Sequence, residues 1–342
     1  MAPDTMRVVE LQGFGGPEVL GVAERAIPQI APGEVLIRVA AAGFNRADVS
    51  QREGQYPPPP GESDLPGLEC SGVVVATGDR TTRLHMGDRV CALLAGGGYA
   101  EFVAVPEEQV LLAPESLDLV DAAGIMEVAA TVLSNLAPGG EESLPLPGSA
   151  VLFHGGSGGL GGFGIQLGAA LGLTVYSTAG TAAGVQHCLE LGAAAACNYR
   201  ERDFAEFISE ETRGIGVDFI LDMVGAPYLM RNLRSLSPEG RLAIIATLGG
   251  SEARLDLRLL MQKRLTVEGT TLRARPVRGA HSKAEIVAAV ERVVWPLISS
   301  ARLRPAAPLR MPLDRAADLH AAHAERSLPP GKAVLVADPT LA

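Results

Sequence analysis

A glycine-rich turn between a strand and a helix most constrains how this chain can fold. Residues Gly156–Gly161 read GSGGLG and satisfy the pattern GxGxxG, directly after the apolar run Ala150–His154 and before an apolar stretch that ends near Leu173. This order is typical of the first βαβ unit of a dinucleotide-binding fold. Glycine accounts for 40 of the 342 residues, so chance matches to the pattern are expected, and it is the position between strand and helix that indicates a binding function. The alternative is a glycine turn that serves packing and binds no ligand.

Each glycine of the pattern has a predicted task. Gly156 permits a tight turn, Gly158 removes the side chain that would block a pyrophosphate, and Gly161 lets the helix lie close to the sheet. The pyrophosphate would then meet free N–H groups and the positive end of the helix dipole.

The residues around the turn predict a parallel, doubly wound sheet. Apolar strands at 174–178, 217–223 and 240–246 alternate with helical stretches, and a helix is expected over 121–134. The first ~120 residues instead predict short strands with glycine or proline between them, typical of a barrel or sandwich. Residues 54–66 contain five prolines and predict a surface loop.

Composition limits the function classes. A formal net charge of −10 argues against a general nucleic-acid binder and gives no support for adhesion to anionic membranes. The first ten residues do not resemble a signal peptide. Cys70, Cys91, Cys188 and Cys197 form no CxxC pair and are expected to be reduced core residues, which indicates a cytoplasmic location.

The segment after the second predicted strand bears on the choice of cofactor. An NAD enzyme usually places an acidic residue there, against the ribose hydroxyls. Residues 178–184 read TAGTAAG and contain no acid, which favours NADPH. Thr181, Tyr199 and Arg200 are the candidate contacts of a 2′-phosphate, although Arg200 is nearly as well explained as a solvated surface residue. Gly180 in the same segment is a candidate cofactor contact.

Several motifs together resemble the medium-chain dehydrogenase/reductase superfamily, in its zinc-independent NADPH:quinone oxidoreductase branch and most closely the p53-inducible quinone oxidoreductase group. They cover nearly the whole chain: GFGGPEVL, AGFNRADVSQREGQYPPPPG, LPGLECSGVV, GDRVCALLAGGGYAEFV, the glycine turn, LGAAAACNY and PGKAVLV. The resemblance implies an α/β protein with a GroES-like β-rich catalytic domain and a Rossmann domain, and an active site in the cleft between them. We place the first part of the catalytic domain at 1–123, the Rossmann NADPH-binding domain at 124–272 and a return segment at 273–342.

The resemblance also predicts that no zinc is bound. Zinc-dependent relatives carry a cysteine ligand and a histidine where this chain has Asn45 and Leu68, and Cys91 stands alone where structural-zinc relatives have four cysteines. Without a Lewis acid, oxidation of an unactivated alcohol is poorly supported, whereas hydride transfer to an electrophilic acceptor needs none.

Site residues follow from the same resemblance. Tyr56 in GQYP is a candidate proton donor over the nicotinamide, and shielding of the ring or ordering of the proline loop is its alternative. Asn45 is a candidate contact of the nicotinamide ribose or substrate, or else a turn-capping residue. Thr131 would face the nicotinamide, unless it only bonds its own helix backbone. The remaining implied cofactor contacts are Ser157, Gly159, Leu160, Ala246, Thr247, Thr270, Thr271, Leu272 and Lys332.

The chain departs from the family pattern at two places. It lacks the lysine that relatives carry near 183–184 beside the 2′-phosphate, which predicts a weaker preference for NADPH. Val128, Ala129 and Ala130 stand where relatives have aromatic residues, which predicts a larger pocket and a bulky substrate, such as a biosynthetic enone or an enoyl thioester.

Two other groups of residues could indicate a different chemistry. His320 and His323 are spaced i,i+3 on an expected helix, but no third ligand stands near them, so these two and His281 are predicted to be surface histidines. Gly155, Ser157 and Gly159 also match the nucleophile elbow GxSxG, and His320 or His323 follow in the chain order of a hydrolase. The β-rich first part of the chain argues against that interpretation.

Two functions remain open at this point. The first is an NADPH-dependent reductase of a quinone or an α,β-unsaturated carbonyl (enone, enal or enoyl thioester). The second is a non-catalytic dinucleotide-binding or redox-sensing protein that retains the fold, because fold alone does not establish activity. Residues 264–273 resemble the edge strand through which relatives pair their Rossmann sheets, which predicts a homodimer acting on a small-molecule electrophile.

Overall fold

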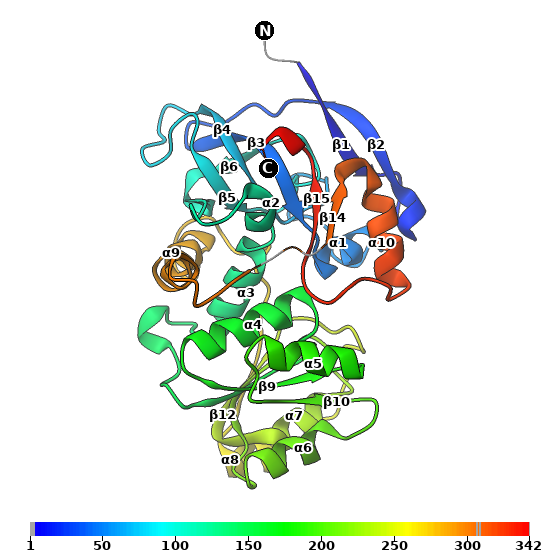
Figure 1. Ribbon diagram of the computed structural model, residues 1–342, viewed down its shortest axis with the longest axis vertical. Helices are drawn as coiled ribbons and strands as arrows, with labels where there is room; N and C mark the ends of the chain where they lie inside the picture. Colours follow the sequence, from blue (N-terminus) through cyan, green and yellow to red (C-terminus); the bar gives the residue numbers. More distant parts are fainter. Residues whose placement is uncertain (1–3, 306, 308, 342) are drawn as a thin grey trace. The chain divides into compact units, whose positions relative to one another are not determined.

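The computed structural model describes residues 4–305, 307 and 309–341, and its internal contacts divide the chain into two units (Figure 1). The first unit comprises Met1–Ala130, Leu272–Ala301 and Pro305–Ala342, and the second comprises Thr131–Thr271 with Arg302–Arg304. Both ends of the chain therefore contribute to one unit, and the middle of the chain forms the other.

The first unit is built on a mixed, mainly antiparallel sheet. Its strands lie in the order β14-β15-β3-β4-β5-β7, β6 pairs with β3, and β1 and β2 form a separate two-stranded sheet. The strands are β1 (Thr5–Leu11), β2 (Leu20–Ala26), β3 (Glu34–Gly43), β4 (Glu69–Thr77), β5 (Arg89–Leu93), β6 (Phe102–Pro106), β7 (Val110–Leu112), β14 (Leu309–Pro312) and β15 (Ala333–Val336).

Hydrophobic alternation explains the core of this unit. Val35, Ile37 and Val39 point to one side of β3 and are all fully buried, whereas Arg38 between them is exposed. The helices of the unit are α1 (Arg46–Arg52), α2 (Leu119–Ala122), the start of α3 (Met126–Leu136), α9 (Lys283–Ser299) and α10 (Ala316–Ala324).

The second unit is the predicted doubly wound sheet. Its strands lie in the order β10-β9-β8-β11-β12-β13, and every neighbouring pair is parallel. The strands are β8 (Ala150–Phe153), β9 (Thr174–Ala179), β10 (Ala195–Asn198), β11 (Val217–Asp222), β12 (Leu236–Ile244) and β13 (Thr266–Gly269). The helices are the rest of α3, α4 (Gly159–Ala170), α5 (Ala182–Glu190), α6 (Phe204–Glu211), α7 (Leu229–Ser235) and α8 (Leu257–Lys263). The predicted α/β class, with a β-rich unit and a doubly wound parallel sheet, is thus confirmed, and all four cysteines are buried and free.

Two local predictions were wrong. The helix expected over 121–134 is two helices, α2 and α3, and the stretch Leu119–Leu136 has the hydropathy of a membrane span but is 83% buried inside the protein. His320 is not a surface residue: its ring lies 5.0 Å from that of Phe44, and the half-buried His323 lies 5.2 Å from the same ring. The i,i+3 spacing places both imidazoles on the face of α10 that packs against Phe44. His281 is exposed, as predicted.

Candidate functional site

The glycine turn follows β8, and its close contacts explain its composition. Gly155 has φ +66°, a left-handed conformation that favours glycine, so the turn begins one residue before the GxGxxG pattern. A Cβ on Gly156 would lie 2.0 Å from Oγ of Ser177, and one on Gly161 would lie 2.4 Å from the carbonyl oxygen of Gly155. Glycine is needed at both positions because the backbone packs directly on its neighbours.

The helix that follows can receive an anion. Gly158 is the N-cap of α4 and has no side chain to bond the first-turn N–H groups. A Cβ there would approach only the carbonyl oxygen of Gly155, at 3.5 Å, so the space over Gly158 is open. Ser157, Gly159 and Leu160 are partly exposed around it. An open glycine at an uncapped helix N-terminus fits the pyrophosphate of a dinucleotide.

Three predicted contacts of the 2′-phosphate gather at the end of β9. A Cβ on Gly180 would lie 2.6 Å from the hydroxyl of Tyr199 and 3.4 Å from Nε of Arg200, so both side chains lie against this glycine. Thr181 caps α5, and its hydroxyl accepts a hydrogen bond from the N–H of Gly184 at 3.0 Å. A phenol, a hydroxyl and a guanidinium therefore surround the place where the acid of an NAD enzyme is missing.

A buried polar chain, which sequence reasoning missed, lies beneath the turn. The imidazole of His154 contacts Oγ1 of Thr178 at 3.0 Å and Oδ1 of Asn232 at 2.8 Å, and Nδ2 of Asn232 donates to Asp222 at 3.0 Å. Thr178 in turn accepts from the N–H of Gly155 at 3.3 Å. Burial lowers the pKa of His154 to about 4 and raises the pKa of Asp222 to about 6. The chain joins the carboxyl ends of β8, β9 and β11.

Asn135 connects two predicted cofactor residues. Its Nδ2 donates to the carbonyl of Thr131 at 2.8 Å, and its Oδ1 accepts from the hydroxyl of Thr270 at 2.9 Å. Ala246 and Thr247 lie in the loop after β12, which is the carboxyl edge of the same sheet. Thr271 and Leu272 continue from Thr270 along the chain. Thr131 lies on α3 and Leu272 belongs to the first unit, but the other predicted contacts of this unit follow the carboxyl ends of β8, β9, β10, β12 and β13, as in the dinucleotide sites of such sheets.

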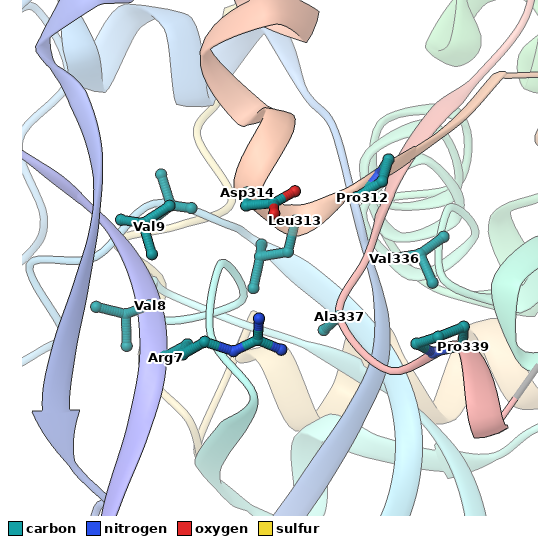
Figure 2. Close-up of a pocket in the computed structure, with 10 residues that line it drawn as sticks. Arg7, Val8, Val9, Pro312, Leu313, Asp314, Val336, Ala337 and Pro339 are labelled. Carbon is teal, nitrogen blue, oxygen red and sulfur yellow. The ribbon is translucent and has the colours of Figure 1, made fainter.

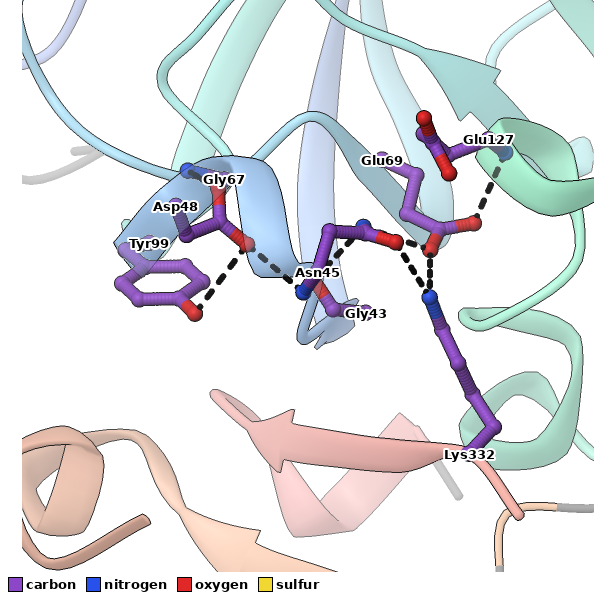
Figure 3. A network of polar contacts seen from close by, with 8 residues as sticks. All are labelled: Gly43, Asn45, Asp48, Gly67, Glu69, Tyr99, Glu127 and Lys332. Carbon is purple, nitrogen blue, oxygen red and sulfur yellow. Dashed lines mark hydrogen bonds and ion pairs between the residues drawn. The ribbon is translucent and has the colours of Figure 1, made fainter. Parts of the chain in front are cut away.

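In the other unit, Asn45 belongs to a buried charged cluster (Figure 3). Its Nδ2 donates to Oε1 of Glu69 at 2.9 Å, and its Oδ1 accepts from the ammonium of Lys332 at 2.6 Å. Lys332 also forms an ion pair with Glu69 at 2.6 Å, and the second oxygen of Glu69 accepts from the N–H of Glu127 at 3.0 Å. Lys332 is one of the predicted cofactor contacts, and its ammonium is bonded to two buried acceptors.

The cluster continues from Asn45 to Asp48. The backbone N–H of Asn45 donates to Asp48 at 2.8 Å, as in a helix cap, and the N–H of Gly67 donates to the other carboxylate oxygen at 3.1 Å. Burial raises the pKa of Asp48 to about 6. The hydroxyl of Tyr99 lies 3.4 Å from Asp48 and 3.3 Å from Nε2 of His320. His320 therefore meets a phenol rather than the carboxylate that a hydrolase triad requires.

Tyr56 lies beyond the other end of α1. Its side chain is partly buried, and burial raises the pKa of its phenol. Its carbonyl accepts a hydrogen bond from Arg273 at 2.9 Å, and the Arg273 guanidinium carbon lies 5.3 Å from the ring centroid. The two predicted catalytic residues thus flank one short helix.

A separate hollow of about 150 Å³ lies between β1 and the C-terminal segment (Figure 2). Arg7, Val9, Leu313 and Asp314 are among its lining residues, and none of the predicted site residues is. Arg7 is already paired with Glu101. This hollow offers no group for the expected chemistry.

Comparisons with known proteins agree with this architecture. Residues 31–115 match the model of the alcohol dehydrogenase GroES-like domain, and residues 159–290 match that of the zinc-binding dehydrogenase family. A quinone oxidoreductase of Homo sapiens is 31% identical over 333 residues, which cover 97% of this chain and 98% of the relative. A quinone oxidoreductase of Escherichia coli, solved in complex with NADPH, superposes with a TM-score of 0.85 at 28% identity and covers 97% of this chain and 100% of its own. A mycobacterial protein, also solved with NADPH, has a TM-score of 0.84 at 29% identity and the same coverage.

The open glycine cradle, the parallel sheet and the nearly complete coverage by these relatives lead to one assignment. The chain is an oxidoreductase that belongs to the quinone oxidoreductase branch of the medium-chain dehydrogenase/reductase superfamily.

Proposed function

We propose that the chain is a zinc-independent, NADPH-dependent reductase that transfers hydride to a quinone or to an α,β-unsaturated carbonyl. The open space over Gly158, at the uncapped N-terminus of α4, carries this proposal. Gly156–Gly161 would hold the pyrophosphate, and Thr181, Tyr199 and Arg200 would hold the 2′-phosphate. When bound, NADPH supplies the hydride.

The unit made of both chain ends would act as the catalytic domain, and the middle unit as the cofactor domain. In the catalytic domain, Tyr56 is the proposed proton source and Asn45 the proposed polar contact of substrate or ribose. A quinone can take its proton from water, so the phenol matters most for an enone, whose α-carbon must be protonated.

The Lys332–Glu69–Asn45 cluster supports zinc independence. Asn45 stands where zinc-dependent relatives place a cysteine ligand, and its carbonyl oxygen already accepts from an ammonium. The same ammonium neutralises Glu69. A divalent cation beside these groups would meet a fixed positive charge and a weak amide ligand.

We also propose a homodimer formed through the edge of the parallel sheet. β13 is the last strand and pairs only with β12 among the described strands. Val267 on β13 is 36% exposed, and Leu257 and Met261 on the neighbouring α8 are 61% and 75% exposed. An exposed edge strand beside apolar side chains suits pairing with a second copy. A cytoplasmic location stays a prediction.

Consumption of NADPH tests the reductase function. The purified chain is assayed with phenanthrenequinone, a panel of enones and an enoyl thioester, and each assay is repeated with NADH. Turnover that is faster with NADPH supports the proposal. Tight NADPH binding without turnover of any acceptor contradicts it and favours the non-catalytic or redox-sensing alternative.

A further inference from the structure

Arg273 is a buried cation that ties three distant segments together. Its Nε donates to the carbonyl of Ala95 at 2.6 Å, its Nη1 to the carbonyl of Tyr56 at 2.9 Å and its Nη2 to Oε1 of Gln51 at 2.8 Å. Only 3% of the residue is exposed. These three hydrogen bonds point in different directions and fix the position of the guanidinium, because its donors form a planar, rigid group.

The charge of Arg273 is directed at the ring of Tyr56. The guanidinium carbon lies 5.3 Å from the ring centroid, within the range of a cation–π contact. The hydrogen bonds of Arg273 go to two carbonyls and an amide rather than to a carboxylate. Its charge is therefore not cancelled by a direct ion pair, and it acts on the phenol through a poorly solvated region.

Opposing effects act on the phenol. Burial raises the pKa of Tyr56 and so does the negative charge of Glu127, whereas the positive charge of Arg273 and a hydrogen bond from its backbone work in the lowering direction. A buried phenol without the charge of Arg273 would release its proton less readily, since the phenolate would be less stabilised.

We propose that Arg273 is the positioning residue of Tyr56: it fixes the loop that carries the phenol, and its charge favours transfer of the phenolic proton to the reduced acceptor. This inference rests on the proposed reductase function. It adds a residue with no predicted catalytic or cofactor role, adjacent in sequence to the predicted cofactor contact Leu272.

In the reduction of an enone, the hydride that NADPH would supply adds to the β-carbon, and the electron pair of the C=C bond moves toward the carbonyl oxygen to give an enolate. The O–H bond of Tyr56 then breaks, and its proton forms a new C–H bond at the α-carbon. Water returns a proton to the phenolate, which the guanidinium stabilises in the meantime.

The competing explanation is that Arg273 only stabilises the loop and has no influence on the proton. A double-mutant cycle separates the two, because a positioning residue acts through its target. The cycle compares Arg273→Met, Tyr56→Phe and the double variant. Arg273→Lys is added because lysine keeps the positive charge but lacks the several hydrogen-bond donors of the guanidinium. Arg278→Gln is the matched control, since Arg278 lies in the same segment but is paired with Glu108 at the surface.

We expect Arg273→Met to lower kcat for an enone about tenfold and to leave kcat for a quinone within about twofold. In the Tyr56→Phe background, the same substitution should change enone kcat by less than about twofold. Arg273→Lys should recover part of the loss. Equal losses in both backgrounds, equal losses for enone and quinone, or an unchanged enone kcat in Tyr56→Phe would each overturn the inference.

Hydrogen exchange supplies a readout that needs no turnover. Arg273→Met should speed amide exchange in peptides covering 51–66, where the N–H groups of Gln55 and Tyr56 bond the carbonyl of Ser50, and Arg278→Gln should not. Unchanged exchange in Arg273→Met overturns the positioning role. If the wild-type chain turns over no acceptor, the proposed function fails, and the exchange experiment still decides whether Arg273 holds the loop.

Discussion

The ammonium of Lys332 lies 2.6 Å from Oε1 of Glu69, and the Glu69 side chain is fully buried. The same ammonium bonds Asn45, so the pair fixes the amide that stands at the place of a zinc ligand in other members of the superfamily. A buried charge that loses its partner is costly, whereas a buried pair contributes little net stability. We therefore infer that this ion pair positions the side chain of Asn45 and adds little to the stability of the fold.

Removal of one partner should show this asymmetry. Lys332→Met leaves the Glu69 carboxylate buried and unpaired, and we expect it to lower the free energy of unfolding by about 3–5 kcal/mol. The double variant Lys332→Met/Glu69→Gln should recover most of that loss. Arg278→Met, which breaks the exposed pair with Glu108, should cost less than about 1 kcal/mol. Urea unfolding measures all three, and a double variant as unstable as Lys332→Met contradicts the argument.

Two glycines of one turn should respond in opposite ways to alanine. In Gly158→Ala the new methyl group meets nothing closer than 3.5 Å, so stability should hardly change, but the methyl group fills the space over the helix N-terminus. We expect the Kd for NADPH to rise at least about tenfold. In Gly161→Ala the methyl group would lie 2.4 Å from a backbone oxygen, and unfolding should become easier by about 1–3 kcal/mol.

Thermal unfolding and titration of NADPH fluorescence test this pair. If Gly158→Ala binds NADPH as tightly as the wild type, the cradle does not hold the pyrophosphate.

The parallel sheet was predictable because its strands are short apolar runs separated by helical stretches and glycines. The Rossmann turn was predictable for the same reason, but the left-handed conformation of Gly155 was not, since local patterns do not fix individual φ angles. The Lys332–Glu69 pair was not predictable: a lysine at the start of a strand normally reads as exposed, and its partner comes from the other end of the chain. His320 was misjudged because its burial depends on Phe44, which no local pattern connects to it.

Arg200 should set the preference between the two cofactors. Its Nε and the hydroxyl of Tyr199 both lie against Gly180, while the lysine of the relatives is missing. We expect Arg200→Gln to raise KM for NADPH about tenfold and to leave KM for NADH within about twofold, because only NADPH carries the 2′-phosphate. Arg234→Gln, an exposed arginine of α7, is the control. Equal changes in the two KM values would show that Arg200 does not read the phosphate.

The edge strand predicts a simple change in assembly. Val267→Lys places a charge on β13, and we expect it to convert a dimer into a monomer, because edge lysines block pairing between sheets. Leu146→Lys changes a side chain that is 77% exposed elsewhere in the same unit and should leave the dimer intact. Sedimentation velocity measures the mass of each form. A wild-type chain that is monomeric at every concentration rules out the proposed homodimer.

The acid response of the chain should depend on His154. Burial lowers its pKa to about 4, so the folded protein keeps it neutral while the unfolded chain binds a proton below its usual pKa of about 6.5. Its stabilising contribution is therefore complete above that value and is lost as the pH falls from about 6.5 to 4. The pKa of Asp222 is raised to about 6, so the folded protein binds its proton first and gains stability as the pH falls from about 6 to 4.

Substitution of each group should reveal these opposite signs. The free energy of unfolding of the wild type, measured relative to that of His154→Gln, should fall by about 3 kcal/mol between pH 6.5 and 4. Measured relative to that of Asp222→Asn, it should rise by a similar amount over the same range. Urea unfolding at several pH values gives both curves. If the two differences change with pH in the same direction, His154 and Asp222 titrate as one coupled system through Asn232, and the separate pKa values assigned to them are wrong.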